Sequence, residues 1–128
     1  MRVSRLTGWV VAGDVVFLLG VTLAGELTHG LSLLSGRWLS TFIPLLVGWA
    51  LTAPALELYQ PSRWSRAGIG GRALWAALLA TPMAAWLRGL WLQAPILPFF
   101  VLVLSAITGL TMAVWREGLA LVLRLRKA

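Results

Sequence analysis

The sequence predicts an all-α integral membrane protein, an antiparallel four-helix bundle with both termini in the cytoplasm, in which residues 1–128 form a single transmembrane domain. Hydrophobic residues make up 59% of the chain and charged residues only 12%, whereas a soluble domain has about 25% charged residues. Four apolar stretches of about 20 residues, at about 1.5 Å per residue, match the roughly 30 Å hydrocarbon core of a bilayer. The connections that remain are too short for a separate soluble domain.

The first apolar stretch predicts a helix from about Thr7 to about Leu27. Arg2 and Arg5 before it are typical of a secretory signal, but Asp14 interrupts the apolar run. We therefore expect this helix to be retained as the first membrane span. Asp14 then lies about 10 Å inside the span, where a charge is costly.

The second helix is expected from about Thr41 to about Tyr59. Pro54 lies inside this range and is expected to kink the helix, because proline has no backbone N–H. The segment that follows contains Pro61, three glycines and three arginines, and is the clearest break in the chain. It predicts a loop between the second and third helices.

The third helix is expected from Ala73 to Leu92, with Pro82 near the middle of the span. The fourth is expected from about Ile96 or Pro98 to Arg116, and the extension over 117–128 is expected to continue the helix along or out of the interface. The connection between the two helices is short. They are therefore predicted to be antiparallel neighbours.

Small side chains recur at four-residue intervals on the third and fourth helices, which allows close approach of helices in lipid. We expect these residues to pack the two helices as a tight hairpin. They are Ala77, Thr81, Ala85 and Gly89 in the third helix, and Ser105, Gly109 and Ala113 in the fourth.

The chain carries eleven Lys and Arg against four Asp and Glu, a formal net charge of +7. All the basic residues except Arg37 and Arg88 fall at the two ends of the chain or between the second and third helices. By the positive-inside rule this distribution predicts cytoplasmic termini in the cell inner membrane, with anionic lipids at the cytoplasmic surface. Because the basic residues are scattered over several loop ends, nucleic-acid binding is not expected.

Ionisable residues in or near the spans are the main candidates for a functional site, because each must find a partner or water. One alternative is structural: Arg88 pairs with Glu26, and Asp14 is neutralised by Arg116 or Arg72. The other is the handling of a proton or substrate, for which Asp14 is the better candidate because it lies deeper. The full set is Asp14, Glu26, Glu57, Arg88 and Arg116.

Three further side chains are candidates for contact with a pigment or cofactor. His29, the only histidine, has the chemistry to ligate a haem or chlorin, and Trp49 and Trp86 are able to stack on a flat hydrophobic molecule. A surface histidine and ordinary packing of the two indoles are the alternatives. The sequence requires no cofactor, although a bound lipid or pigment is compatible with it. Without cysteines, clustered ligands or catalytic motifs, we expect neither a metal site nor an enzyme.

Short motifs are spread over most of the chain: Asp14, Thr28-His29-Gly30, Ile43–Trp49, Tyr59, Trp86–Arg88, Pro98–Val101 and Trp115-Arg116. Together they resemble a family of small bacterial and archaeal four-helix membrane proteins described as a domain of unknown function. The sequence departs from the family pattern at Glu26, where a basic or neutral residue is expected. The resemblance implies the four-helix fold and its topology, and it carries no activity, cofactor or catalytic residue.

We expect a small accessory or scaffolding subunit that packs against other membrane protein subunits, for instance in a respiratory or photosynthetic complex. The short loops and the small-residue faces, which exceed those that one hairpin uses, favour this role. The alternative is a small oligomeric transporter or proton-coupled carrier. In that case Asp14 is the titrating group, and Pro54 and Pro82 are the hinges.

Overall fold

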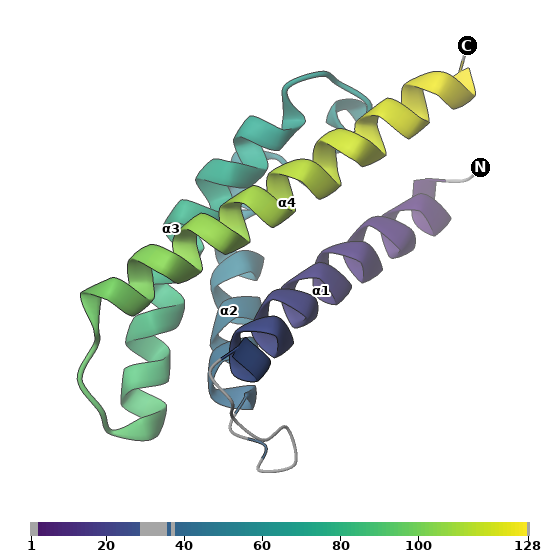
Figure 1. Ribbon diagram of the computed structural model, residues 1–128. Helices are drawn as coiled ribbons and strands as arrows, with labels where there is room; N and C mark the ends of the chain where they lie inside the picture. Colours follow the sequence, from purple (N-terminus) through teal and green to yellow (C-terminus); the bar gives the residue numbers. More distant parts are fainter. Residues whose placement is uncertain (1–2, 29–35, 37, 128) are drawn as a thin grey trace.

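The computed structural model describes residues 3–28, 36 and 38–127, and this part of the chain is built from helices (Figure 1). Four segments are long and apolar enough to cross a membrane: Arg5–Gly25, Leu39–Leu56, Ile69–Leu92 and Pro98–Arg126. They indicate a multi-pass membrane protein. The elements are α1 (Val3–Thr28), α2 (Leu39–Thr52), the short 3-10 turns η2 (Pro54–Leu56) and η3 (Pro61–Arg63), α3 (Ile69–Leu92) and α4 (Pro98–Lys127).

The second helix differs from the prediction, because α2 ends at Thr52 and not near Tyr59. Pro54 does not kink a continuous helix. It begins the 3-10 turn η2, where its missing N–H is harmless. Glu57 then adopts a left-handed conformation with φ of 62°, and the chain turns back so that the Leu58 N–H donates to the Ala53 carbonyl at 3.0 Å.

The third helix is longer than expected, and the fourth includes the tail. α3 begins at Ile69, after Gly68 in a left-handed conformation with φ of 89°, so residues expected in the loop belong to the helix. α4 begins at Pro98 and continues to Lys127. The tail 117–128, as far as the structure describes it, continues the helix, as one of the expectations from the sequence had it.

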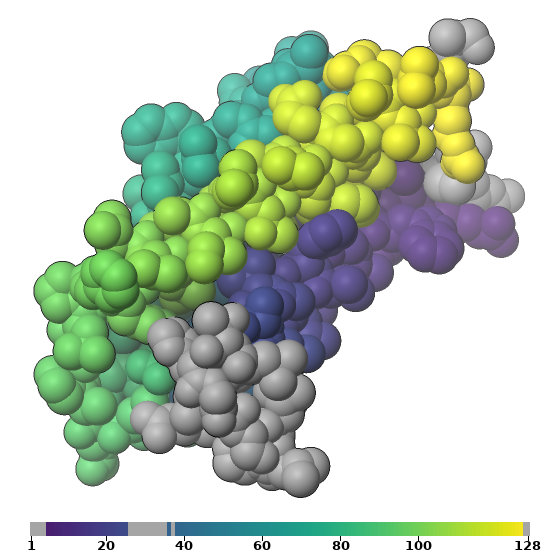
Figure 2. Space-filling model, in the orientation of Figure 1, coloured from purple at the N-terminus to yellow at the C-terminus, as the bar shows by residue number. Residues whose placement is uncertain are grey.

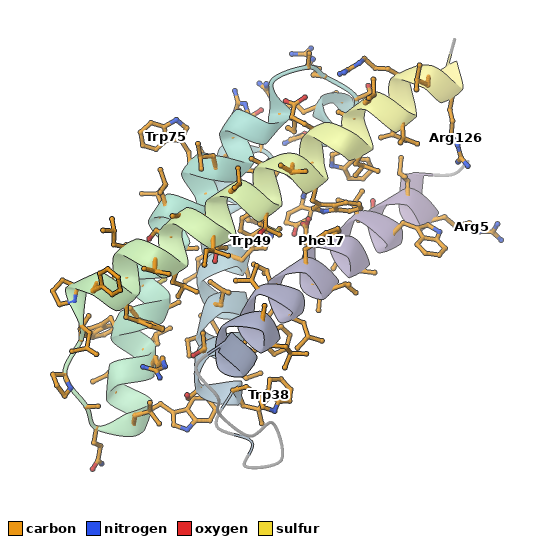
Figure 3. The ribbon with its side chains drawn as sticks, in the orientation of Figure 1. Arg5, Phe17, Trp38, Trp49, Trp75 and Arg126 are labelled. Atoms are coloured by element: carbon orange, nitrogen blue, oxygen red, sulfur yellow. The ribbon has the colours of Figure 1, made fainter. Side chains whose placement is uncertain are left out.

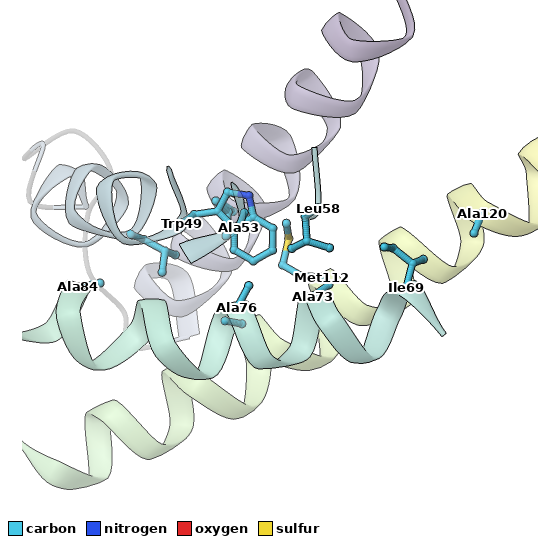
Figure 4. Packing of buried hydrophobic residues seen from close by; sticks show 12 residues of the cluster. Trp49, Ala53, Leu58, Ile69, Ala73, Ala76, Ala84, Met112 and Ala120 are labelled. Atoms are coloured by element: carbon cyan, nitrogen blue, oxygen red, sulfur yellow. The ribbon is translucent and has the colours of Figure 1, made fainter. Parts of the chain in front are cut away.

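Helix α3 is the most extensively packed element, with α2 on one side and α4 on the other. Its buried face consists largely of alanines, which lets both neighbours come close. Against α4, the Thr81 and Ser105 hydroxyls form a hydrogen bond. Against α2, the Thr52 hydroxyl reaches the Ala76 carbonyl at 3.1 Å. The close-up in Figure 4 shows Ala73, Ala76 and Ala84 in this cluster, together with Trp49, Leu58 and Met112.

The other small residues predicted to pack α3 on α4 lie in different settings. A Cβ added at Gly109 would lie 2.6 Å from Leu74 Cδ1 and 3.9 Å from Ala77 Cβ, and Ala85 is buried. The Ala113 carbonyl lies against Gly70, 2.7 Å from where a Cβ would be. Gly89 instead faces the connection after α3, where its nearest neighbour is the Ala94 carbonyl.

Helix α1 contacts α2 and α4 much less extensively than α3 contacts its neighbours. One face of α1 is buried, at Val10, Asp14, Leu18 and Val21, and the rest is largely exposed. In Figure 1 the beginning of α1 and the end of α4 lie toward the same end of the molecule.

We predict that Gly48→Ala lowers the free energy of unfolding by about 1–3 kcal/mol, because overpacking forces helices apart. The added Cβ would lie 2.7 Å from the Ala80 carbonyl oxygen of α3. Unfolding in mixed detergent micelles measures the change. Gly20→Ala is the matched control, since its Cβ would meet no atom of the described residues within 4 Å. Equal stability of the two variants would contradict the close contact of α2 with α3.

Candidate functional site

The centre of the site is an ion pair between Asp14 of α1 and Arg116 of α4, and both side chains are 1% exposed. Arg116 Nη2 donates to Asp14 Oδ2 at 2.7 Å, and Arg116 Nε donates to Oδ1 at 2.9 Å. This two-point geometry is the strong form of an arginine–carboxylate contact. It joins the first and last helices of the chain inside the apolar region.

Three aromatic side chains complete the hydrogen bonding of the Asp14 carboxylate. Trp115 Nε1 donates to Oδ1 at 2.8 Å, while Trp49 Nε1 donates to Oδ2 at 3.3 Å. The Tyr59 hydroxyl also donates to Oδ2. A carboxylate has about four lone-pair sites, so these donors and Arg116 saturate it. Figure 3 shows Trp49 and Phe17 directed into the space between α1, α2 and α4 where this network lies.

Helix α1 admits Trp115 because Gly13 has no side chain. A Cβ at Gly13 would lie 2.1 Å from the Trp115 ring. The same indole stacks on Phe17, with 4.9 Å between the ring centroids. Trp115 therefore fills the contact between α1 and α4 and at the same time hydrogen-bonds Asp14.

The guanidinium of Arg116 has a second anchor in the turn after α2. Its Nη1 donates to the Leu58 carbonyl at 2.8 Å, and its Cζ lies 5.2 Å from the centre of the Tyr59 ring. Trp64 Nε1 donates to the same Leu58 carbonyl at 3.0 Å. The left-handed residue Glu57 directs this turn, so the early end of α2 at Thr52 and the turn that follows bring Leu58 and Tyr59 to the site.

Tyr59 lies in the connection between α2 and α3, outside the apolar spans. Burial and the neighbouring Asp14 carboxylate raise the pKa of its phenol above the usual value of about 10. The phenol thus stays a neutral donor to Asp14. A phenolate would repel the carboxylate and lose the hydrogen bond.

A family model described as "Protein of unknown function (DUF3054)" matches residues 11–119. The chain belongs to this family. No curated protein and no solved structure matches the chain. The segment matched to DUF3054 contains every residue of the Asp14 network, from Gly13 to Arg116, and leaves out the last turns of α4.

Two of the other ionisable candidates, Glu57 and Arg88, do not join this network. Glu57 pairs with Arg63 at 2.6 Å in a partly exposed position. Arg88 Nε donates to the Thr41 hydroxyl at 3.0 Å, and its Cζ lies 4.6 Å from the centre of the Phe100 ring. The expected pairing of Arg88 with Glu26 lies outside the described part, because the Glu26 side chain is not described.

Of the two partners considered for Asp14, the structure selects Arg116. Arg72 instead donates to the Leu56 carbonyl at 3.0 Å. Among the candidates for pigment contact, Trp49 is buried in the network and Trp86 is 54% exposed on α3. His29 lies outside the described residues. Within the described residues, no three carboxylates or imidazoles gather in a way that could hold a metal ion.

Sequence reasoning did not identify Tyr59, Trp115 and the Leu58 carbonyl as partners of the ion pair. Trp115 could have been predicted as a partner, because it directly precedes Arg116 and a buried indole N–H needs an acceptor. The Leu58 carbonyl could not have been predicted, because its position depends on the backbone turn at Glu57. Glu117 is a further case: its carboxylate accepts the Gly70 N–H at 2.9 Å, near the beginning of α3.

We predict that Arg116→Gln lowers the free energy of unfolding by about 3–5 kcal/mol, because Asp14 is left buried without its counter-charge. Unfolding in mixed micelles measures the loss. The control is Arg63→Gln, which removes an arginine from the partly exposed pair with Glu57 and should cost less than about 1 kcal/mol. A small effect at Arg116 would show that the pair does not hold α1 to α4.

Tyr59 is the only tyrosine, so phenolate absorbance reports its ionisation alone. We predict that the folded protein shows little phenolate at pH values just above 10, while the unfolded chain ionises near pH 10. Because folding raises the pKa, this contribution to stability is fully present below about pH 10 and is lost as pH rises through the folded pKa. Tyr59→Phe should remove this part of the pH dependence. Normal titration of the folded protein near pH 10 would contradict the buried contact with Asp14.

Proposed function

We propose that this member of the DUF3054 family is a small accessory or scaffolding subunit of a larger membrane complex, with respiratory and photosynthetic assemblies as the leading class. The observation that carries the proposal is the saturated Asp14 carboxylate. A side chain bound by Arg116, Trp115, Trp49 and Tyr59 acts as a fixed structural link. The only buried ion pair among the described residues thus stabilises the fold.

Two small residues of α1 support a role in assembly. Gly8 and Gly20 are exposed, and no atom of the described residues lies within 4 Å of where a Cβ would be at either position. Within the described part of the chain, no other helix packs against them. Close approach of helices in lipid needs such positions, so each of these glycines suits contact with a helix of a partner subunit.

We infer an antiparallel bundle with cytoplasmic termini in the inner membrane of a prokaryotic cell. Arg5, Arg66 and Arg126 lie in the three segments that the positive-inside rule would place in the cytoplasm. Tags at either end should accordingly be accessible from the cytoplasmic side.

A proton-coupled carrier is the alternative. It needs Asp14 to gain and lose a proton, which requires breaking the two-point contact with Arg116. Of its two expected hinges, Pro82 lies inside α3, whereas Pro54 lies beyond the end of α2. The network therefore favours the structural role.

We predict that the chain, purified in mild detergent from its own membrane, retains larger partner subunits detected by native mass spectrometry. Gly20→Leu should release these partners by filling the space that a partner helix would occupy at this position, while the isolated chain keeps its stability. Gly118→Leu on α4 is the matched control, because a Cβ at this position also meets no described atom within 4 Å. Elution of the native chain without any partner would overturn the accessory role. Proton flux in liposomes that is abolished by Asp14→Asn would favour the carrier instead.

A further inference from the structure

The end of the molecule where α1 begins and α4 ends carries arginines that form no ion pair within the described part of the chain. Arg5 of α1, Arg66 of the connection before α3, and Arg126 of α4 all have exposed side chains. Among the described residues, the ion pairs are those of Asp14 with Arg116 and Glu57 with Arg63. The three arginines are therefore available to an anionic ligand from outside the chain.

Arg5 and Arg126 lie at the same level of the bundle. Asp14 and Arg116 are in contact, and from that contact Arg5 is about 14 Å along α1 and Arg126 about 15 Å along α4, by helical rise. Figure 3 shows both arginines at this end, with the Arg126 side chain projecting on the side of α4 where α1 begins. In Figure 2 the two helix ends occupy one end of the visible face.

This level is the edge of the apolar region. Arg5 is the first residue of the first apolar span, and Arg126 is the last residue of the fourth. Lipid phosphates lie at the boundary between hydrocarbon and water, and arginine binds phosphate with paired N–H donors. The two cations are thus at the depth of a headgroup.

On each helix, an apolar side chain lies on the same face as the arginine, one turn further into the apolar span. Trp9, one turn into the span from Arg5, is 69% exposed. Val122, one turn into the span from Arg126, is 50% exposed. Residues four apart share a helix face, so each arginine stands above an apolar surface. A ligand that matches both has a phosphate with acyl chains attached.

We propose that Arg5 and Arg126 form a binding site for the headgroup of an anionic phospholipid, whose acyl chains lie along Trp9 and Val122. The site does not depend on the accessory role proposed above. Loss of partner subunits and loss of lipid binding are measured separately, so either can fail alone.

Native mass spectrometry of the purified full chain with phosphatidylglycerol or phosphatidylcholine tests the site. We expect tighter binding of phosphatidylglycerol, weakened about fivefold by Arg5→Gln and by Arg126→Gln, since each cation near an anionic surface contributes about that factor. Trp9→Ala should weaken binding of the same lipid without a change in charge. Helical content by circular dichroism checks that the variants fold.

The matched control is Arg66→Gln, which removes another exposed cation, in the connection before α3. It should change binding less than twofold. An effect equal to that of Arg5→Gln would mean a diffuse basic surface and would overturn the site. Equal binding of the two lipids, or full displacement of phosphatidylglycerol by inorganic phosphate, would also overturn it.

Discussion

The ion pair between Asp14 and Arg116 is the constraint on which the position of α1 depends. Two charges removed from water are costly, and the cost is offset only when their geometry is good and their remaining hydrogen-bonding groups are satisfied. Both conditions are met, because Arg116 contacts both carboxylate oxygens and also donates to the Leu58 carbonyl. A helix with little other packing is thereby held by polar contacts in one place.

The rest of the bundle is held differently. Between helices in lipid there is no hydrophobic driving force, so association relies on close van der Waals contact and hydrogen bonds. The alanine face of α3 provides that contact with both neighbours, and the hydroxyl pair of Thr81 and Ser105 adds a polar link. The molecule thus combines an α2–α3–α4 unit with extensive small-residue packing and an α1 attached through charge.

The sequence predicted the spans well, because apolar length is a local property that any helix crossing lipid must have. It did not predict where α2 ends. Proline is tolerated inside membrane helices, so Pro54 was compatible with a kink or with an end, and the apolar residues after it favoured the longer helix. The partner of Asp14 could not be predicted for the same reason. From the sequence, Arg72 and Arg116 were equal candidates to pair with Asp14. In the structure, the turn after Pro54 places the Leu56 carbonyl where Arg72 donates to it, and it places the Tyr59 hydroxyl against the Asp14 carboxylate.

The saturation of Asp14 also bears on what this site is able to do. A carboxylate that exchanges protons must have a lone pair free for the proton in at least one state, and the path to it must admit water or another carrier. Here each oxygen already accepts from several donors, and protonation would leave Arg116 charged and buried without its partner. Protonation of Asp14 would therefore break the contact between α1 and α4. The network is therefore suited to keep one arrangement that holds α1 against α4.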